Sequence, residues 1–203
     1  AGIACGIKNT GIGNGMPDAS KVKIEIVSEE KVVLYHGWTE MGQGVHNMAL
    51  QTLCEETNIS PEVIEVKVET REATAFTGMT TASRATSLVG NATINAAKEL
   101  KNDLKTKQLK DLQGKSYNGE WICNFTTKAG TEKEGEEVIT HYSYSYATQV
   151  AVLDETGKVD TIYAAHDAGK IMNPALFEGQ IQGSLHMGLG YTLSEDCEYK
   201  DGY

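Results

Sequence analysis

The sequence predicts an α+β fold in which a layered antiparallel or mixed sheet is covered by long helices. Two observations support this fold class. Short runs that alternate between apolar and polar residues, such as 23–27 and 141–146, indicate strands with one buried face. A ladder of apolar residues at every fourth position over 88–104 indicates a long helix, and residues 175–193 are predicted to form another.

Size and composition describe an ordinary globular chain. Its 203 residues, 40% hydrophobic and 23% charged, are enough for a single domain over 1–203, and whether it forms one lobe or two stays open. No apolar run approaches the roughly 20 residues that cross a bilayer, so we expect no membrane partner. The chain starts without Met and both ends lack terminal character, so we expect a fragment of a longer protein.

Charge and cysteine usage exclude several kinds of partner. A net charge of −10 argues against nucleic acid, because phosphate backbones need stripes of Lys and Arg. The four cysteines lie far apart without a C-x-x-C pair, which disfavours zinc or iron–sulfur binding by this chain. We expect reduced thiols in a cytoplasmic protein, with disulfides as the alternative.

The first half of the chain predicts three strands and a helix after a glycine-rich start. Residues 11–15 (GIGNG) resemble a dinucleotide fingerprint, but the spacing and the polar residues that follow favour a strand end and turn. Strands are predicted at 23–27, 32–36 and 63–68. A helix is predicted at 46–56, and Pro61 and the residues before it stop that helix.

The second half begins with a segment that lacks periodicity. Residues 105–140 are rich in Lys, Glu, Gly and Asn, which predicts a surface excursion with one short hairpin near 121–123. A hairpin is then predicted, with strands at 141–153 and 159–166. Its tyrosines at 142, 144 and 146 favour a packed sheet face over an aromatic binding platform.

One loop stands out chemically, TEMGQG at residues 39–44, between the strand at 32–36 and the helix at 46–56. A helix start presents unpaired N–H groups and partial positive charge, so it can bind an anionic ligand. Gly42 and Gly44 let the backbone approach that ligand, and the Gln43 amide can donate and accept. The alternative is a plain strand-to-helix turn.

Two further stretches carry unexplained features. Residues 77–87 hold six hydroxyl-bearing side chains ahead of the long helix, and a helix cap needs only one or two. The excess favours a second surface facing a polar ligand. The last helix contains Gly179, Gly183, Gly188 and Gly190, each costing about 0.8–1 kcal/mol relative to alanine. That cost implies tight helix packing or close approach of backbone to a ligand.

Three of these stretches together resemble one family. TEMGQG at 39–44, TTASRATSLVGNA at 80–92 and HDAGKIMNPALFEGQIQGSLHMGLG at 166–190 are similar, in order and spacing, to the molybdopterin-binding subunit of the xanthine dehydrogenase and aldehyde oxidase family. The resemblance covers nearly the whole chain, specifically the C-terminal part of that subunit. The opening GIACGIKNTGIGNG suggests a bacterial protein.

The resemblance implies a pterin site built from three walls. Met41, Gly42, Gln43 and Gly44 would contact the molybdenum–molybdopterin cofactor from one side, in a plain or dinucleotide form. Thr81, Ala82, Ser83 and Thr86 would line the other side, and Gln180 would bind from the last helix. Arg84 would form a surface salt bridge, with phosphate contact as the alternative.

The resemblance also implies what this chain lacks. The family's catalytic base is a glutamate in a GE-type motif, and no such motif occurs here, so we assign no catalytic residue and expect an inactive fragment. No histidine pair has metal-ligand spacing, and the cofactor's dithiolene would hold the metal. Iron–sulfur clusters and FAD would lie on other domains or subunits. The substrate would be a purine, a related heterocycle or an aldehyde. The alternative is a non-catalytic α+β module that binds no pterin.

Overall fold

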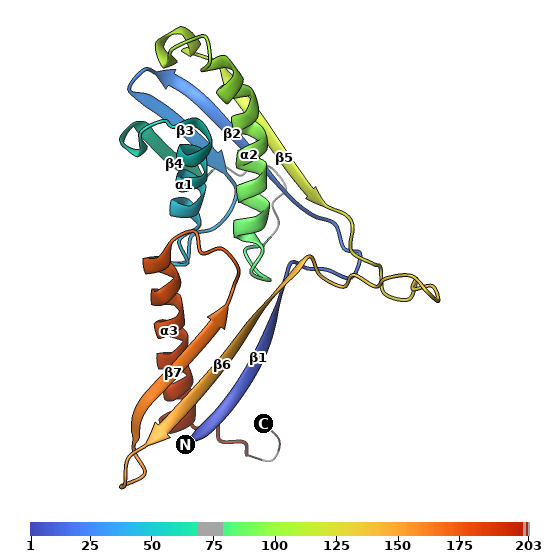
Figure 1. The fold of residues 1–203 in the computed structure, drawn as a ribbon, viewed down its shortest axis with the longest axis vertical. Helices are drawn as coiled ribbons and strands as arrows, with labels where there is room; N and C mark the ends of the chain where they lie inside the picture. Colours follow the sequence, from blue (N-terminus) through green and yellow to red (C-terminus); the bar gives the residue numbers. More distant parts are fainter. Residues whose placement is uncertain (69–78, 201, 203) are drawn as a thin grey trace.

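The computed structural model describes residues 1–68, 79–200 and 202, and it contains two separate sheets (Figure 1). The four-stranded sheet has the order β4-β3-β2-β5, and the three-stranded sheet has the order β1-β6-β7. The strands are β1 (Gly2–Thr10), β2 (Asp18–Ser28), β3 (Lys31–His36), β4 (Ile64–Val68), β5 (Ser116–Cys123), β6 (Ser143–Leu153) and β7 (Val159–Asp167). The helices are α1 (Val45–Thr57), α2 (Ala85–Asp103) and α3 (Pro174–Leu193), with short 3-10 turns at Pro61–Val63 and Leu109–Leu112.

The hydrophobic core lies between the four-stranded sheet and helices α1 and α2. Strand β2 alternates between buried and half-exposed residues over most of its length, so one face of the sheet is apolar. The predicted ladder on α2 supplies the facing layer, since Leu88, Ala92, Ala96 and Leu100 are all fully buried. Trp38 is also fully buried, and its indole N–H donates to Ser20 Oγ at 2.9 Å. The predicted α+β fold with helices covering a sheet is confirmed.

The four-stranded sheet is mixed, which is one of the two sheet types that the sequence prediction allowed. Strands β2 and β3 pair antiparallel across a tight turn, whereas β3 and β4 pair parallel, with α1 forming the crossover. Helix α1 ends at Asn58, whose φ of 58° places it in the left-handed region and whose backbone N–H donates to the Cys54 carbonyl. A left-handed residue of this kind terminates a helix. The predicted strands and helix of the first half are therefore confirmed, with shifted ends.

The prediction of a surface excursion over 105–140 is wrong for its central part. Residues Ser116–Cys123 form β5, which pairs antiparallel with β2 along the edge of the core sheet rather than closing a local hairpin. Gly119 permits this packing, because a Cβ at that position would lie 2.1 Å from the Ala92 carbonyl oxygen of α2. The inward face of β5 carries Tyr117, Trp121 and Cys123 at alternate positions, and Gly119 interrupts this apolar pattern, which weakens the strand signal in the sequence.

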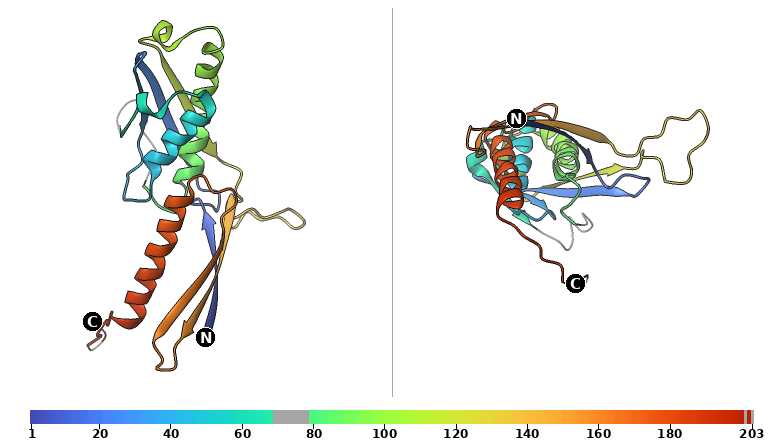
Figure 2. Two further views of the ribbon diagram at one scale, coloured as in Figure 1. Left: turned by 60° about the vertical axis from the view of Figure 1, so that its left-hand side comes forward. Right: turned by 90° about the horizontal axis from the view of Figure 1, so that it is seen from below.

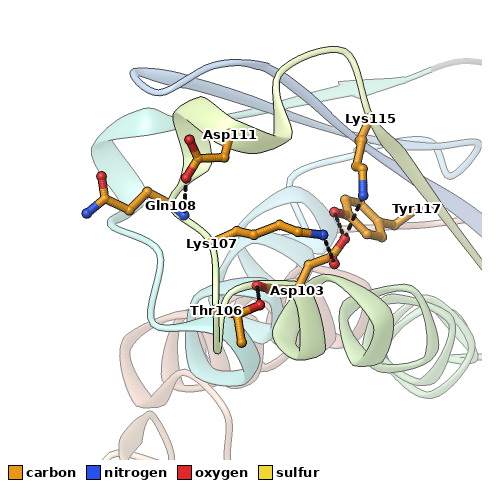
Figure 3. Close-up of polar contacts among 7 residues, drawn as sticks. All are labelled: Asp103, Thr106, Lys107, Gln108, Asp111, Lys115 and Tyr117. Atoms are coloured by element: carbon orange, nitrogen blue, oxygen red, sulfur yellow. Dashed lines mark hydrogen bonds and ion pairs between the residues drawn. The ribbon is translucent and has the colours of Figure 1, made fainter.

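A polar cluster fastens the C-terminal end of α2 to β5 (Figure 3). The Asp103 carboxylate accepts hydrogen bonds from Lys107 Nζ at 2.7 Å, Lys115 Nζ at 3.1 Å and Tyr117 Oη at 2.8 Å. These donors, Lys107 first, hold the pKa of Asp103 well below its usual range. The cluster joins residues on both sides of the 3-10 turn Leu109–Leu112. It therefore holds residues 103–117, most of which fall in the predicted surface excursion, against the end of α2.

The three-stranded sheet is open to solvent in the described chain. Strand β6 pairs antiparallel with both β1 and β7, and the predicted hairpin over residues 141–166 is confirmed. Tyr144 is 44% exposed and Tyr146 is 51% exposed, so a packed face at these two positions is wrong. Tyr142 differs, because it packs edge-on against Trp121 of the core sheet. The sheet lacks a covering layer among the described residues, and this explains the exposure of the other two tyrosines.

Helix α3 runs with the three-stranded sheet away from the core (Figure 2). It begins and ends as predicted, yet none of its 20 residues is buried. A Cβ built on Gly179, Gly183 or Gly188 would meet nothing within 4 Å, so the described residues give these glycines no close neighbour. Within the described part of the chain, no helix is both long and apolar enough to span a membrane.

Candidate cofactor-binding site

A cleft of about 810 Å³ is lined by residues at the N-terminal ends of α1, α2 and α3. Figure 1 shows that these three helix ends lie near one another. All three stretches selected from the sequence contribute to the wall of the cleft. The lining includes eight of the nine predicted site residues: Met41, Gln43, Gly44, Thr81, Ala82, Ser83, Thr86 and Gln180. The ninth, Gly42, adjoins the cleft through its carbonyl oxygen, which accepts from Gln180 Nε2 at 3.5 Å. Segments 138 positions apart are thus brought together.

The first wall is the loop at residues 39–44, and Glu40 organises it. Glu40 Oε1 accepts the backbone N–H groups of Gly42 at 2.9 Å and Gly44 at 2.8 Å, while its Oε2 accepts that of His46 at 3.1 Å. Burial opposes ionisation, but the three hydrogen bonds outweigh it and lower the pKa of Glu40. Glu40 thus already binds three of the backbone N–H groups that the sequence analysis expected an external anion to use.

Gln43 and two glycines shape the same loop. Gln43 Oε1 accepts the Met41 N–H at 2.6 Å, and its Nε2 donates to the Thr39 carbonyl at 2.9 Å. The Gln43 side chain therefore bridges its own loop, with one amide hydrogen left over for a ligand. Gly42 and Gly44 have φ values of 95° and 86°, a region that favours glycine, so both glycines are needed for this loop shape.

The second wall precedes α2 and is tied directly to the first. Thr80 Oγ1 accepts the Thr39 N–H at 3.0 Å and donates to the Thr39 carbonyl at 3.4 Å. Ala82 and Ser83 both have positive φ, 57° and 52°, which is uncommon for residues with a side chain. No side chain caps the start of α2, so a capping role for the surplus hydroxyls is wrong. Thr81, Ser83 and Thr86 line the cleft instead, while Thr77 lies outside the described residues.

Arg84 lies beneath this wall rather than on the surface. Its guanidinium pairs with the Asp18 carboxylate, donates to the Met79 carbonyl, and lies 4.8 Å above the Trp38 ring. Both charged side chains are almost completely buried, at 3% and 1% exposed. The predicted surface salt bridge is therefore a buried one. Asp18 also accepts the Ile12 N–H at 3.1 Å, which anchors the glycine-rich turn.

Two histidines support the loop from below. His36 is fully buried, and its Nδ1 accepts the Trp38 N–H at 3.1 Å. Its ring meets that of His46 edge-on, with centroids 5.0 Å apart. Burial, followed by the neighbouring His46, lowers the pKa of His36 to about 4, although the Glu40 charge opposes the shift. The predicted packing and hydrogen-bonding role of His36 is confirmed.

Comparison with known proteins identifies the family to which this fold and cleft belong. The profile of the molybdopterin cofactor-binding domain family matches residues 1–203. The chain belongs to this family. The molybdopterin cofactor-binding domain is a part of enzymes like xanthine dehydrogenase and aldehyde oxidoreductase, and the resemblance read from the three stretches is confirmed.

Individual relatives agree with this assignment. The chain is 30% identical to a probable xanthine dehydrogenase subunit of Bacillus subtilis, over 99% of this chain and 31% of that protein. It is 24% identical to mouse xanthine dehydrogenase/oxidase, over 87% of this chain and 14% of that protein. The aldehyde oxidoreductase of Desulfovibrio desulfuricans has the same fold, with a TM-score of 0.78 and 26% identity over 98% of this chain and 23% of that one. This chain thus spans less than a third of each.

The cleft of the molybdopterin cofactor-binding domain has a donor set suited to an anionic, polar cofactor. Its described lining contains hydroxyls, carboxamides and the uncapped start of α2, and it contains no Asp or Glu. The negative charge of Glu40, beside the cleft, is turned into its own loop. Among the described residues no cluster of three His, Cys, Asp or Glu side chains could hold a metal ion. The residues present therefore fit molybdopterin.

Sequence reasoning missed part of this lining. Ser143, Tyr144 and Ser145 at the start of β6 contribute to the cleft, and nothing local in that alternating strand signals it. The loop before α3 contributes Lys170, and that loop lay inside the third stretch. Asn173 caps α3 by accepting the Leu176 N–H, and its Nδ2 donates to Gln51 Oε1 of α1 at 3.1 Å.

Proposed function

We propose that the cleft holds the pyranopterin of a molybdenum cofactor in a xanthine dehydrogenase-like oxidoreductase, which hydroxylates purines, related N-heterocycles or aldehydes. One observation carries the proposal: the loop at 39–44, the hydroxyl-rich residues before α2, and Gln180 of α3 line one cleft. Nothing in the core requires Thr81, Ser83 and Thr86 to gather there, because they cap no helix and are not buried.

The residues would act by binding and orientation. When bound, the cofactor supplies the redox chemistry, and the protein positions it. Thr81, Ser83 and Thr86 would donate hydroxyl hydrogen bonds to polar pterin atoms from one side. The remaining Gln43 amide hydrogen and the exposed Met41 side chain would contact it from the other. Gln180 already reaches the Gly42 carbonyl, so it would close the third side.

The remaining machinery would come from outside this chain. We place the catalytic glutamate in the rest of the same subunit, and the iron–sulfur clusters and FAD on other domains or subunits of a cytoplasmic enzyme. Helix α3 supports the need for a larger assembly, since Met187, Tyr191 and Leu193 are 68%, 74% and 68% exposed. The apolar residues of α3 are spread around the helix instead of forming one stripe, and such a helix is usually buried in the intact protein. The remainder of the subunit is the partner that we propose for this surface.

The second candidate function is a non-catalytic module that keeps the scaffold and binds no pterin. The self-contained bonding of Gln43 and Glu40 favours it, because the loop holds its shape without a ligand. The described lining contains no Asp or Glu, and its second wall carries five hydroxyl-bearing residues, Thr80, Thr81, Ser83, Thr86 and Ser87, which favours the pterin. The two candidates differ in whether cleft residues affect cofactor content.

The test uses the full-length parent protein and measures molybdenum by mass spectrometry and pterin by fluorescence after oxidation. Gln180→Ala and Gln43→Ala are expected to lower both contents about tenfold, the effect of losing one or two good hydrogen bonds. Gln182→Ala is the matched control, since Gln182 is exposed on the same helix and does not line the cleft. Wild-type molybdenum content in both cleft variants would favour the non-catalytic module.

A further inference from the structure

Residue Glu40 has an arrangement that the proposed function does not itself require. Its two carboxylate oxygens bind three donors at the start of α1, the N–H groups of Gly42, Gly44 and His46. A helix N-terminus is where an anionic ligand would otherwise bind. The chain thus fills this position with a carboxylate from the same loop, only four positions before Gly44.

The shape of the loop depends on this carboxylate. Gly42 and Gly44 are held at φ values of 95° and 86°, and both donate to the same Oε1 atom. A Cβ on Gly44 would lie 2.8 Å from Leu176 Cδ1 of α3, so the loop also packs closely against the third wall. If the hydrogen bonds from Gly42 and Gly44 to Glu40 were broken, the loop could change shape, and the distance from the first wall to Gln180 would change with it.

The base of the loop is rigid for a separate reason. His46, the third donor to Glu40, lies edge-on to the buried His36 ring at the end of β3. The His36 Nδ1 accepts the Trp38 N–H, which fixes the turn leading into the loop. The Nε2 atoms of His36 and His46 are both buried without a hydrogen-bond partner among the described residues. The His36 and Trp38 contacts thus hold the base of the loop on the sheet, and the Glu40 side chain holds the backbone at the tip of the loop.

We propose that Glu40 is a positioning residue, an internal anion that holds the loop at residues 39–44 in the conformation that receives the cofactor. The effect on cofactor binding rests on the proposed function, whereas the hydrogen bonds that hold the loop do not depend on it. Glu40 contacts no cofactor in this proposal. It acts through Gly42, Gly44 and His46, whose N–H groups it withdraws from external ligands.

The first measurement is amide hydrogen exchange of the loop in the full-length parent. Glu40→Ala is expected to raise the exchange rate of the peptide covering residues 39–46 about 10- to 100-fold, because hydrogen bonds to a charged acceptor are lost. Glu40→Gln, which keeps one acceptor oxygen, is expected to lie between Glu40→Ala and the wild type. Glu29→Gln, in the turn between β2 and β3, is the charge-matched control and should leave the loop unchanged.

A chemical rescue distinguishes positioning from general destabilisation. Acetate or formate added to Glu40→Ala is expected to restore slow exchange of this peptide, whereas chloride at equal ionic strength is not. Cofactor content should fall with the loss of protection, while the thermal unfolding midpoint stays at the wild-type value. Wild-type exchange in Glu40→Ala would overturn the inference.

Failure of this inference and failure of the proposed function give different results. If Glu40→Ala loosens the loop while Gln43→Ala and Gln180→Ala retain full molybdenum, the positioning role stands and the pterin site is wrong. If the cleft variants lose molybdenum while Glu40→Ala keeps a protected loop and full cofactor, the pterin site stands and the positioning role is wrong.

Discussion

The Arg84 guanidinium and the Asp18 carboxylate form an ion pair that is almost entirely removed from solvent, with the Trp38 ring beneath the guanidinium. The pair joins the start of β2 to the start of α2, which are 66 positions apart. It therefore fixes the second wall of the cleft on the core sheet. Removing one charge would leave the other buried without its counter-charge.

The first prediction concerns this pair. Arg84→Met is expected to lower the free energy of unfolding by about 3–5 kcal/mol, the usual effect of breaking a buried ion pair by removing one partner. Urea unfolding of the protein measures it. The double variant Asp18→Asn/Arg84→Met should lose less than the sum of the two single variants, because no uncompensated charge remains. Simple additivity of the two changes would show that the pair does not act as a unit.

The second prediction concerns His36 and acid. The pKa of His36 is about 4 in the folded chain and 6.5 in its ordinary state, so the unfolded chain binds more protons between these values. Stability from this residue is complete above about pH 6.5. It is lost as the pH falls towards 4, by about 3 kcal/mol in all, since each pKa unit corresponds to about 1.4 kcal/mol.

Urea unfolding at a series of pH values measures this loss. The wild-type curve is compared with that of His36→Asn, which cannot take up the proton. The difference between the two curves should change across the window from pH 6.5 to 4 and stay constant above it. A constant difference over the whole range would contradict the assignment of a neutral, buried His36.

The third prediction concerns the close contact between α2 and β5. Gly119→Ala places a Cβ 2.1 Å from the Ala92 carbonyl oxygen and 2.5 Å from the Ala96 backbone nitrogen, so the helix must move. The expected loss is about 1–3 kcal/mol or more, as for overpacking elsewhere. Gly6→Ala is the control, because a Cβ there meets nothing within 4 Å, and it should change stability by less than about 0.5 kcal/mol. Equal unfolding midpoints for the two variants would contradict the close approach of α2 to Gly119.

The sequence predicted those elements whose own periodicity identifies them. The apolar ladder of α2 and the alternation of β2 and β6 come from local spacing, and the structure has them where expected. Strand β5 could not be found in this way. Its pairing with β2 is non-local, and Gly119 stands where an apolar residue would have marked the buried face. The prediction for the tyrosines of β6 was wrong because alternation shows only that these side chains lie on one face of the sheet. It does not show whether another element covers that face.

The sequence predicted which residues line the site better than it predicted the contacts that these residues make. The resemblance carried by the three stretches selected Gln43, Ser83 and Gln180, and these residues line one cleft. The partners of Glu40 and Arg84 depend on distances that spacing does not contain. Arg84 is buried because Asp18 lies beside it in the fold, and Glu40 binds N–H groups that two left-handed glycines turn towards it.

The hydroxyl of Thr80 has a mechanical consequence for the width of the cleft. It binds both the N–H and the carbonyl of Thr39, so the two walls share one side chain as a double link. Neither wall can shift outward without stretching both bonds at once. One threonine, 41 positions away from Thr39, thus restrains the first wall against the second, in addition to the contacts that the loop makes with α3.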